Sequence, residues 1–187
     1  MSGSSGSDKP VVDSRKNWRL ADELLAGESD AWRRTMLEGL KEHMQAECGG
    51  NLEALMNTLI DEPVFHNWSA TSDTGPKGRD ALREFYGNLI GSGSNQFEFD
   101  VERIVIGDDT LVTEGNIRVP FSGSMLQTMG VENVDPDSTY ATRGRVVTFW
   151  PFDAAGKIIG EDIYSMTTDF DDLDEVTLLP YVYGEKS

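Results

Sequence analysis

Two histidines occur in the chain, and each falls where the pattern of apolar residues directs a side chain inward. His66 alternates with Val64 and Trp68, which predicts that these three side chains share the buried face of a strand. His43 continues the apolar stripe of a predicted helix, three residues after Leu40. An imidazole in an apolar pocket exchanges protons near neutral pH, so both are candidates for general acid–base catalysis. The alternative for each is a core histidine that is hydrogen-bonded to the backbone.

Glu161 is an acidic residue that could join the histidines. In the last predicted strand, Glu161 shares one side with Ile159, Ile163 and Ser165. A carboxylate that is buried between isoleucines needs a charged or hydrogen-bonded partner. In a pocket it would orient His66 or act as a base itself. The alternative is a glutamate at an open rim, with its carboxylate in water.

Aromatic side chains could form the walls of such a pocket. Four of them could stack on an aromatic or polycyclic ligand, namely Trp68, Tyr86, Trp150 and Tyr164. Aromatic residues more often fill the core, and among the four we expect Trp68 in particular to line the pocket. The neighbouring Asn67 could donate a hydrogen bond, but alternation places it on the face opposite His66.

The motifs of several other kinds of site are missing from the sequence. The acidic segment 169–175 lacks the central glycine and the ligand spacing of a calcium loop, and we interpret it as a solvated turn. The glycine-rich segment 91–94 follows a helix instead of opening one, which is the wrong place for a phosphate. Cys48 is the single cysteine, which excludes an internal disulfide and any site with several cysteines. Without a nucleophile elbow or a metal-binding histidine pair, we expect neither a metal nor an organic cofactor.

The elements that must position these residues are mainly helices in the first half and strands in the second. Cap residues, either Ser29 or Asp30 for the second helix and Asn51 for the third, together with apolar spacing predict helices over residues 18–25, 30–49, 51–62 and 80–91. Alternating patterns predict strands over residues 64–68, 97–102, 111–119, 142–152 and 157–166. The stretch 120–140 is rich in Gly, Ser, Asp and Pro and is predicted as a long loop, of the kind that forms lids or binds partners.

This order of elements predicts an α+β domain, with helices on one side of a curved antiparallel sheet. We expect an N-terminal arm over residues 1–28 that is partly flexible and holds a short helix. One domain is expected over residues 29–187, including an acidic C-terminal tail. Residues 1–7 have the composition of a linker.

The charge of the chain excludes some partners. Against 33 acidic residues stand 16 basic ones, which gives a formal net charge of −17. Such a surface does not suit nucleic acid or anionic membranes and repels anionic substrates, so we expect a neutral small-molecule ligand. No apolar run has the length of a membrane span and no N-terminal stretch is typical of a signal peptide, which predicts a cytoplasmic protein.

The chain also carries four short segments in a characteristic order. They are Gly50-Asn-Leu-Glu-Ala-Leu followed by Asp61-Glu-Pro-Val-Phe-His-Asn-Trp68, then Lys77-Gly-Arg-Asp-Ala-Leu-Arg-Glu-Phe-Tyr86, and Phe152-Asp-Ala-Ala-Gly-Lys-Ile158. Over residues 29–168 the chain resembles the nuclear transport factor 2-like superfamily and, within it, the SnoaL-like branch. Its relatives include ketosteroid isomerase, scytalone dehydratase and limonene epoxide hydrolase. The resemblance implies a cone-shaped α+β barrel, in which a bent antiparallel sheet wraps around N-terminal helices and encloses an apolar cavity.

The resemblance also implies roles for residues. His66 corresponds to the general base of ketosteroid isomerase, His43 to its oxyanion-binding tyrosine and Thr148 to its second oxyanion acid. In the family register, Glu161 and Ser165 face the cavity. The three charged positions of limonene epoxide hydrolase are occupied here by Gly115, Ile117 and Ile163, so hydrolysis of epoxides by that mechanism is not expected.

These observations predict a cofactor-independent lyase or isomerase that acts on a neutral aromatic or polyketide-like molecule. His66, His43 and Glu161 would transfer protons, and Trp68, Tyr86, Thr148 and Ser165 would bind the substrate. Dehydration, retro-aldol cleavage, cyclisation and a double-bond shift all remain open.

Two alternatives use the same fold without chemistry. One is a non-catalytic protein that binds a small molecule or serves as a scaffold, with its cavity filled by apolar side chains. The other assigns the stretch 120–140 and the acidic tail to the docking of a protein partner. In either case the resemblance implies a homodimer, formed through the outer face of the sheet that carries Val105 and Val147.

Overall fold

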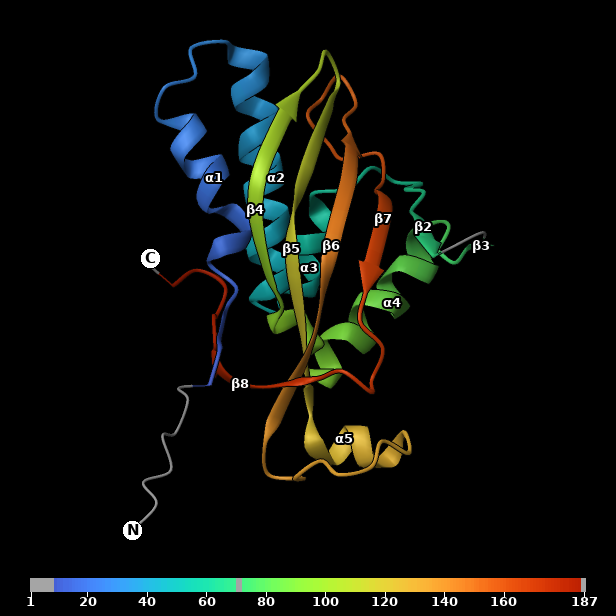
Figure 1. Cartoon of the computed structure of the whole chain (residues 1–187). Coiled ribbons are helices and arrows are strands. Elements are labelled where there is room, and N and C mark those ends of the chain that lie inside the picture. Colours follow the sequence, from blue (N-terminus) through green and yellow to red (C-terminus); the bar gives the residue numbers. More distant parts are fainter. Residues whose placement is uncertain (1–8, 70–71, 186–187) are drawn as a thin grey trace.

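Figure 1 shows the computed structural model of the chain, which describes residues 9–69 and 72–185. Helices lie against a bent sheet that does not close, which confirms the α+β class with a curved sheet around helices. The helices are α1 (Lys16–Leu25), α2 (Ala31–Cys48), α3 (Leu52–Asn57), α4 (Arg79–Ser92) and α5 (Gly123–Thr128), with a short 3₁₀ helix η1 (Ser94–Gln96). The strands are β1 (Val11–Asp13), β2 (His66–Ser69), β3 (Ser72–Asp73), β4 (Glu98–Ile106), β5 (Thr110–Ser122), β6 (Thr139–Pro151), β7 (Asp162–Thr167) and β8 (Asp174–Leu179).

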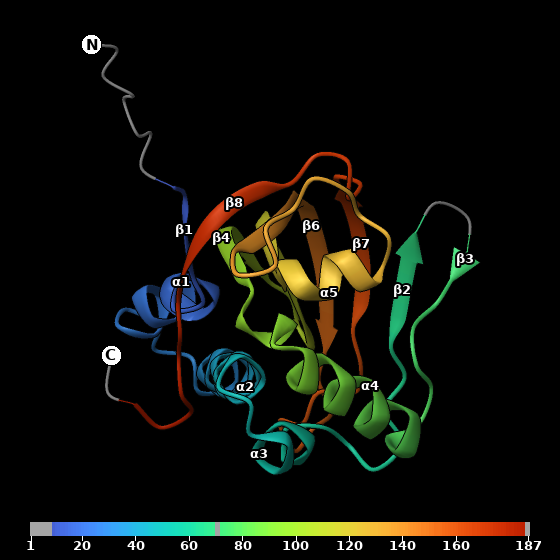
Figure 2. The ribbon, with the colours of Figure 1, turned by 90° about the horizontal axis from the view of Figure 1, so that it is seen from below.

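The sheet is built on an antiparallel meander of β4, β5, β6 and β7. β2 adds to β7 in parallel, and β3 pairs with β2 at the edge. The start of β6 pairs with β8, which in turn pairs in parallel with β1. Seen from below, the sheet curves around the side on which α2 and α4 lie (Figure 2). Inward-facing side chains of the strands therefore converge toward these two helices.

Helices begin at the predicted cap residues. The side chain of Asp30 accepts a hydrogen bond from the backbone of Arg33, and that of Asn51 accepts one from the backbone of Ala54. α2 ends before Gly49 as expected, but α3 ends at Asn57, earlier than predicted. The reason is a competing interaction, because the backbone N–H of Ile60 donates to the carbonyl of Ile158 over 3.1 Å.

The stretch 120–140 is more ordered than predicted. β5 continues to Ser122 and pairs there with Thr139, so β5 and β6 form one long hairpin. Between them lies α5, which is capped by Ser122 and buries Leu126. The prediction of a long loop over residues 120–140 is therefore wrong for the parts that form β5, α5 and β6. The segment lies at one end of the molecule, beyond the sheet (Figure 1).

The C-terminal half differs from the prediction in two further places. β7 begins at Asp162 instead of Lys157, because Ile158 makes isolated bridges with Leu59 and Phe152. The acidic C-terminal tail includes a strand that was not predicted, since residues 174–179 form β8. Asp172 and Asp174 at its start are ion-paired with Arg143 on β6 over 2.8 and 3.0 Å.

The N-terminal segment packs on the rest of the chain. The helix predicted around Trp18 is α1, and Trp18 and Ala21 are buried against the main core. Glu98 of β4 is buried and ion-paired with Lys16 of α1 over 3.0 Å. The division of the chain at residue 28 stays a prediction, and the linker expected over residues 1–7 lies outside the described residues.

The main core lies between the helices and the concave side of the sheet. It joins apolar residues of α2, such as Met36 and Leu40, to Leu82 of α4 and Leu111 of β5. In the parts of the chain covered by the structure, no helix combines the length and apolarity needed to cross a membrane.

Candidate active site

A cavity of about 260 Å³ lies between α2, α4 and the concave side of the sheet. Most of its wall is apolar, with Phe65, Phe97, Phe99 and Trp150 among the lining residues. Phe85 of α4 lines it and is also exposed, so the cavity reaches the molecular surface there. The polar lining residues are Glu47, Asn67, Tyr86, Ser94, Thr148, Glu161, Ser165 and Thr167. An apolar pocket with a few convergent polar groups is the usual form of a small-molecule site.

His43 lies directly behind this wall, with no exposed surface. Its Nδ1 is 2.7 Å from the hydroxyl oxygen of Thr58, and that hydroxyl donates its own proton to the carbonyl of Leu55 over 2.7 Å. Because the hydroxyl has no second proton, His43 Nδ1–H must be the donor to Thr58. The orientation of the ring is thereby set, and Nε2 faces the cavity side.

Three polar atoms meet at this point. Nε2 of His43 is 3.1 Å from Oε1 of Glu161, and the hydroxyl of Tyr86 is 3.0 Å from the same oxygen and 3.3 Å from Nε2. The single proton of Tyr86 satisfies one of these contacts and donates to Glu161. The contact between His43 and Glu161 therefore requires another proton between them, since two lone pairs would repel each other. The two residues form a dyad that holds one proton on either partner.

Burial determines the electrostatics of the cluster. The pKa of Tyr86 lies well above its usual value, chiefly because the ring is buried and also because Glu161 and Glu47 are close. Tyr86 is therefore a hydrogen-bond donor, not a phenolate, at neutral pH. Trp150 packs edge-on against the imidazole of His43 at 5.5 Å between ring centroids. The dyad is shielded from water on its core side, which strengthens electrostatic interactions within it.

Glu47 is a functional candidate that the sequence interpretation missed. It lines the cavity from α2 with 9% of its surface exposed, one helical turn after His43. Burial and the neighbouring Glu161 raise the pKa of Glu47 well above its usual value. The signal was present in the sequence, because Glu47 follows His43 by four residues and so lies on the same, apolar face of the helix.

His66 and Trp68 face away from the cavity, so the inward orientation predicted for both is wrong. In the parallel pairing of β2 with β7, His66 is opposite Asp162 and Trp68 is opposite Tyr164, both on the outer face. The Nδ1 atom of His66 contacts Asp73 of β3 over 2.7 Å, and its ring stacks on Trp68. The structure thus brings His43 and Glu161 together but leaves His66 outside the cavity.

The prediction for His66 was wrong because it took the face with the apolar residues Val64 and Trp68 as the buried face of the strand. The large apolar side chain that this segment buries in the core is Phe65, which is 2% exposed, whereas Val64 is 41% exposed. Asn67 shares the face of Phe65 and lines the cavity, which corrects the opposite orientation predicted for it. The outer face of β2 accepts apolar side chains because they stack on one another, as Trp68 does on Tyr164.

The other predicted binding residues do line the cavity. Tyr86, Thr148 and Ser165 are all in its wall, with Thr148 on β6 and Ser165 on β7. Glu161 and Ile163 also line it, on the side that the family register predicts. The non-catalytic alternative expected a filled cavity and histidines bonded to the backbone, and the geometry agrees with it only in part. Neither histidine touches the cavity, yet the partners of His43 are side chains, not backbone groups.

A family match covers the residues that build the site. The sequence profile of the SnoaL-like domain matches residues 40–161, which include His43, Glu47, Tyr86 and Glu161. No curated protein matches the chain significantly.

Solved structures with the same fold are distant in sequence. A protein from Shewanella putrefaciens, assigned as a SnoaL-like polyketide cyclase, is 14% identical at a TM-score of 0.59, covering 78% of this chain and 86% of that chain. SalBIII, an epoxide hydrolase/cyclase-like enzyme of pyran ring formation in the polyether salinomycin, is 12% identical at a TM-score of 0.53, covering 75% and 95%. RV0760c from Mycobacterium tuberculosis, in complex with estradiol-17beta-hemisuccinate, is 16% identical at a TM-score of 0.51, covering 74% and 97%.

At such low identity these structures show a shared fold only. The family profile supports assignment of the chain to a family, because the residues that it matches include most of the sheet and the helices around the cavity. By this match the chain belongs to the SnoaL-like domain family, and its fold is the one seen in solved NTF2-like proteins.

Proposed function

We propose that the chain is a cofactor-independent enzyme that moves a proton within a neutral, largely apolar small molecule. The observation that carries the proposal is the buried dyad of His43 and Glu161, which lies in the wall of an apolar cavity and receives a hydrogen bond from Tyr86. A proton held between two buried groups can be given to a ligand or replaced from it without water.

Each residue of the dyad has a separate role. Glu161 lines the cavity, so its carboxyl group is the one that exchanges a proton with the substrate. His43 is buried behind Glu161 and is a positioning residue, which accepts or returns the proton as Glu161 changes state. This replaces the role expected for His43 as a direct donor to the substrate. Tyr86 holds Oε1 of Glu161 in place and completes the wall.

The lining indicates which ligands fit. Within the described part of the chain, the residues around the cavity include two glutamates but neither lysine nor arginine. A ligand with a carboxylate or phosphate would meet negative charge without a counter-ion, and it would lose its hydration on entry. A neutral molecule with aromatic or alicyclic carbon and a few oxygen atoms suits the apolar wall, with Asn67, Thr148 and Ser165 as further hydrogen-bonding groups.

Ring closure and double-bond shift are the reaction types that we favour. Both need one proton removed and one returned, which a single dyad supplies. The fold relatives include SalBIII, whose printed role is in pyran ring formation, and a protein assigned as a polyketide cyclase. Dehydration and retro-aldol cleavage use the same proton transfers and belong to the same proposal.

Proton exchange in heavy water tests this function without knowledge of the natural substrate. Neutral ketones such as 2-tetralone are incubated with the protein in D₂O, and deuterium at carbon is followed by NMR. We expect exchange above that in buffer for the wild type. In Glu161→Gln it should fall by about 10²–10⁴-fold, the range for loss of a general acid–base group.

Two further variants serve as controls for this experiment. Glu38→Gln changes an exposed glutamate of the same helix as His43 and should leave the exchange rate unchanged. His66→Ala should also retain it, because His66 lies outside the cavity. Equal exchange in Glu161→Gln and wild type would sink the proposal. A wild type that binds these ketones but never exchanges their protons would favour the non-catalytic binding protein instead.

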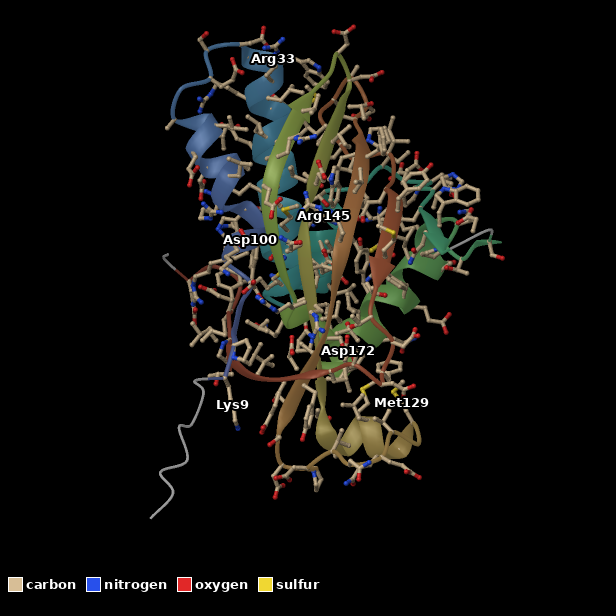
Figure 3. The ribbon with its side chains drawn as sticks, viewed as in Figure 1. Lys9, Arg33, Asp100, Met129, Arg145 and Asp172 are labelled. Carbon is tan, nitrogen blue, oxygen red and sulfur yellow. The ribbon has the colours of Figure 1, made fainter. Side chains whose placement is uncertain are left out.

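We further propose that the enzyme is a homodimer that forms through the outer face of the sheet. Apolar side chains are exposed there at Val105 on β4, Phe149 on β6, and Tyr164 and Met166 on β7, and the ring of Tyr164 contacts both Phe149 and Trp68 of β2. Such a contiguous patch is rare on a monomeric surface. The centre of the same face carries Arg145, labelled in Figure 3, in ion pairs with Glu102 and Glu114 over 2.6 and 2.8 Å.

A further inference from the structure

We infer that Glu47 is a second ligand-binding group of the cavity, a neutral carboxylic acid that donates a hydrogen bond to a ligand oxygen. It would select neutral carbonyl compounds and discriminate against both amines and carboxylates. The inference rests on the proposed function for the choice of cavity, and it names the class of substrate that the cavity takes.

The position of Glu47 supports this role. Its side chain is nine-tenths buried on α2, and it lines the cavity together with Glu161. Among the residues that the structure describes, none makes a hydrogen bond or ion pair with its carboxyl group. A buried polar group without a protein partner loses the free energy of its hydration, unless a ligand or water supplies the missing bond. The ligand that enters the cavity is the partner that this arrangement lacks.

The groups that face Glu47 decide its protonation state. From α2 these are His43, one turn earlier, and Cys48, whose pKa is raised by burial. From the segment before β7 comes Glu161, and from α4 comes Tyr86. The described cavity lining contains no lysine or arginine that could stabilise an anion at Glu47. His43, the remaining basic group nearby, contacts Glu161 over 3.1 Å and so does not serve as a counter-ion for Glu47. Without a cation beside it, the buried carboxyl group of Glu47 is more stable in its neutral form.

A neutral carboxyl group opposite a base suits one kind of chemistry. When Glu161 removes a proton from carbon next to a carbonyl, the electrons of the C–H bond form a C=C bond and those of the C=O bond move to oxygen. The O–H group of Glu47 donates to that oxygen, which gains negative charge as the reaction proceeds. The electrons flow back when Glu161 returns the proton to carbon, so no other reactant is needed.

The protonation state can be measured on the free protein. The full chain is labelled with ¹³C at the side-chain carboxyl of glutamate, and the resonances are followed by NMR from acid to neutral pH. We expect a resonance in the position of a protonated carboxyl at pH 7, absent from Glu47→Gln and present in Glu38→Gln. A protonated resonance of the dyad would disappear in Glu161→Gln instead, and if no protonated resonance is lost in Glu47→Gln, the inference is wrong.

Ligand class is tested with two probes of the same skeleton. 2-Acetonaphthone carries a carbonyl group and 1-(2-naphthyl)ethylamine an ammonium group, and binding of each is measured by calorimetry. We expect the ketone to bind more tightly than the amine. Its affinity should fall about tenfold in Glu47→Leu, as for loss of a buried hydrogen bond, and recover in part in Glu47→Gln, whose amide still donates.

Three results of the binding experiment would overturn the inference. One is tighter binding of the amine in a manner that depends on Glu47, which would make Glu47 an ionised counter-ion. Another is unchanged affinity for the ketone in Glu47→Leu, and the third is no saturable binding of the ketone to the wild type. None of these depends on turnover, so failure of this inference is distinct from failure of the exchange experiment with Glu161→Gln.

Discussion

The two histidines illustrate how the surroundings of one residue type decide its chemistry. His43 is held between Thr58 and Glu161 without exposed surface, so its proton has a defined route to the cavity wall. His66 is partly exposed and bonded to Asp73, whose pKa is lowered mainly by Lys77 and also by the backbone of Gly75 and by His66. His66 therefore lies in contact with solvent, whereas the ring of His43 contacts only protein groups.

Glu47 should make the stability of the protein fall as pH rises. Its folded-state pKa lies above the usual 4.5, so the folded chain keeps a proton that the unfolded chain releases. This contribution is complete below pH 4.5 and is lost as pH rises toward the folded-state pKa. Relative to Glu47→Gln, the free energy of unfolding of the wild type should decline by up to about 1.4 kcal/mol per pH unit in that window.

Urea denaturation of both proteins between pH 4 and 8 measures this difference. Tyr86 and Cys48 also have raised pKa values, but their usual values of 10.0 and 9.0 lie above this window. Glu38→Gln, which alters an exposed carboxyl of the same helix, should follow the wild type. Parallel curves for wild type and Glu47→Gln would mean that Glu47 is ionised in the folded protein.

At the scale of elements, the site depends on how closely the segment before β7 approaches β2. The backbone of Val64 donates to the carbonyl of Ile159 over 3.1 Å, and that of His66 donates to the carbonyl of Glu161 over 2.6 Å. Between these bonds lies Gly160, where a Cβ atom would be only 1.9 Å from the carbonyl oxygen of Val64. The missing side chain lets the two segments pair and brings Glu161 to His43.

Alanine substitutions at two glycines should therefore have opposite effects. Gly160→Ala should destabilise the protein by about 1–3 kcal/mol, because backbone must move to admit the methyl group. It should also slow proton exchange, since Glu161 is the next residue. Gly87→Ala, in the exposed middle of α4 with no atom within 4 Å of the new Cβ, should stabilise by about 0.5–1 kcal/mol.

Thermal and urea unfolding of both variants measures the stability difference, and the D₂O exchange assay measures the effect on the site. Gly87→Ala is the matched control for exchange, because it adds the same methyl group at an exposed position of α4 where no atom lies within 4 Å of the new Cβ. A Gly160→Ala protein with wild-type stability and exchange would show that the close approach of the two segments is not needed.

On the scale of the whole molecule, the two faces of the sheet are used differently. The concave face and the helices enclose the cavity, while the outer face presents exposed apolar residues around Tyr164 and charged ones around Arg145, which is labelled in Figure 3. The net charge of −17 opposes association between copies of the chain. The apolar patch is the part of the surface where burial of area can outweigh that repulsion.

Tyr164→Glu should convert the proposed dimer into a monomer. Tyr164 is 49% exposed on the outer face and stacks on Trp68, so a carboxylate there would face its own copy across the interface. Light scattering after size exclusion should report the mass of two chains for the wild type and of one chain for the variant. Added salt should favour the wild-type dimer by screening the net charge. A wild type that is monomeric over the whole concentration range would contradict the prediction.

Local patterns were sufficient for most of the architecture. Asp30 and Asn51 cap helices because their side chains accept backbone hydrogen bonds, a property that depends on neighbours only three residues away. Alternation placed Glu161 and Ser165 on one side of the last predicted strand, and the family resemblance implied that this side faces the cavity, which both residues line. Where the pattern was evenly balanced, as at Val64, Phe65 and His66, local rules did not decide which face is buried.

By itself, the sequence determined the α+β class, the starts of the main helices and the excess of acidic side chains, because these follow from local propensity, alternation and composition. Only the tertiary structure decided which polar groups meet. The register of β2 on β7 turned His66 outward and Asn67 inward. Packing of α2 and α4 against the segment before β7 joined His43, Tyr86 and Glu161, which are far apart in sequence. Such contacts depend on the summed geometry of the whole core, which no single stretch of sequence encodes.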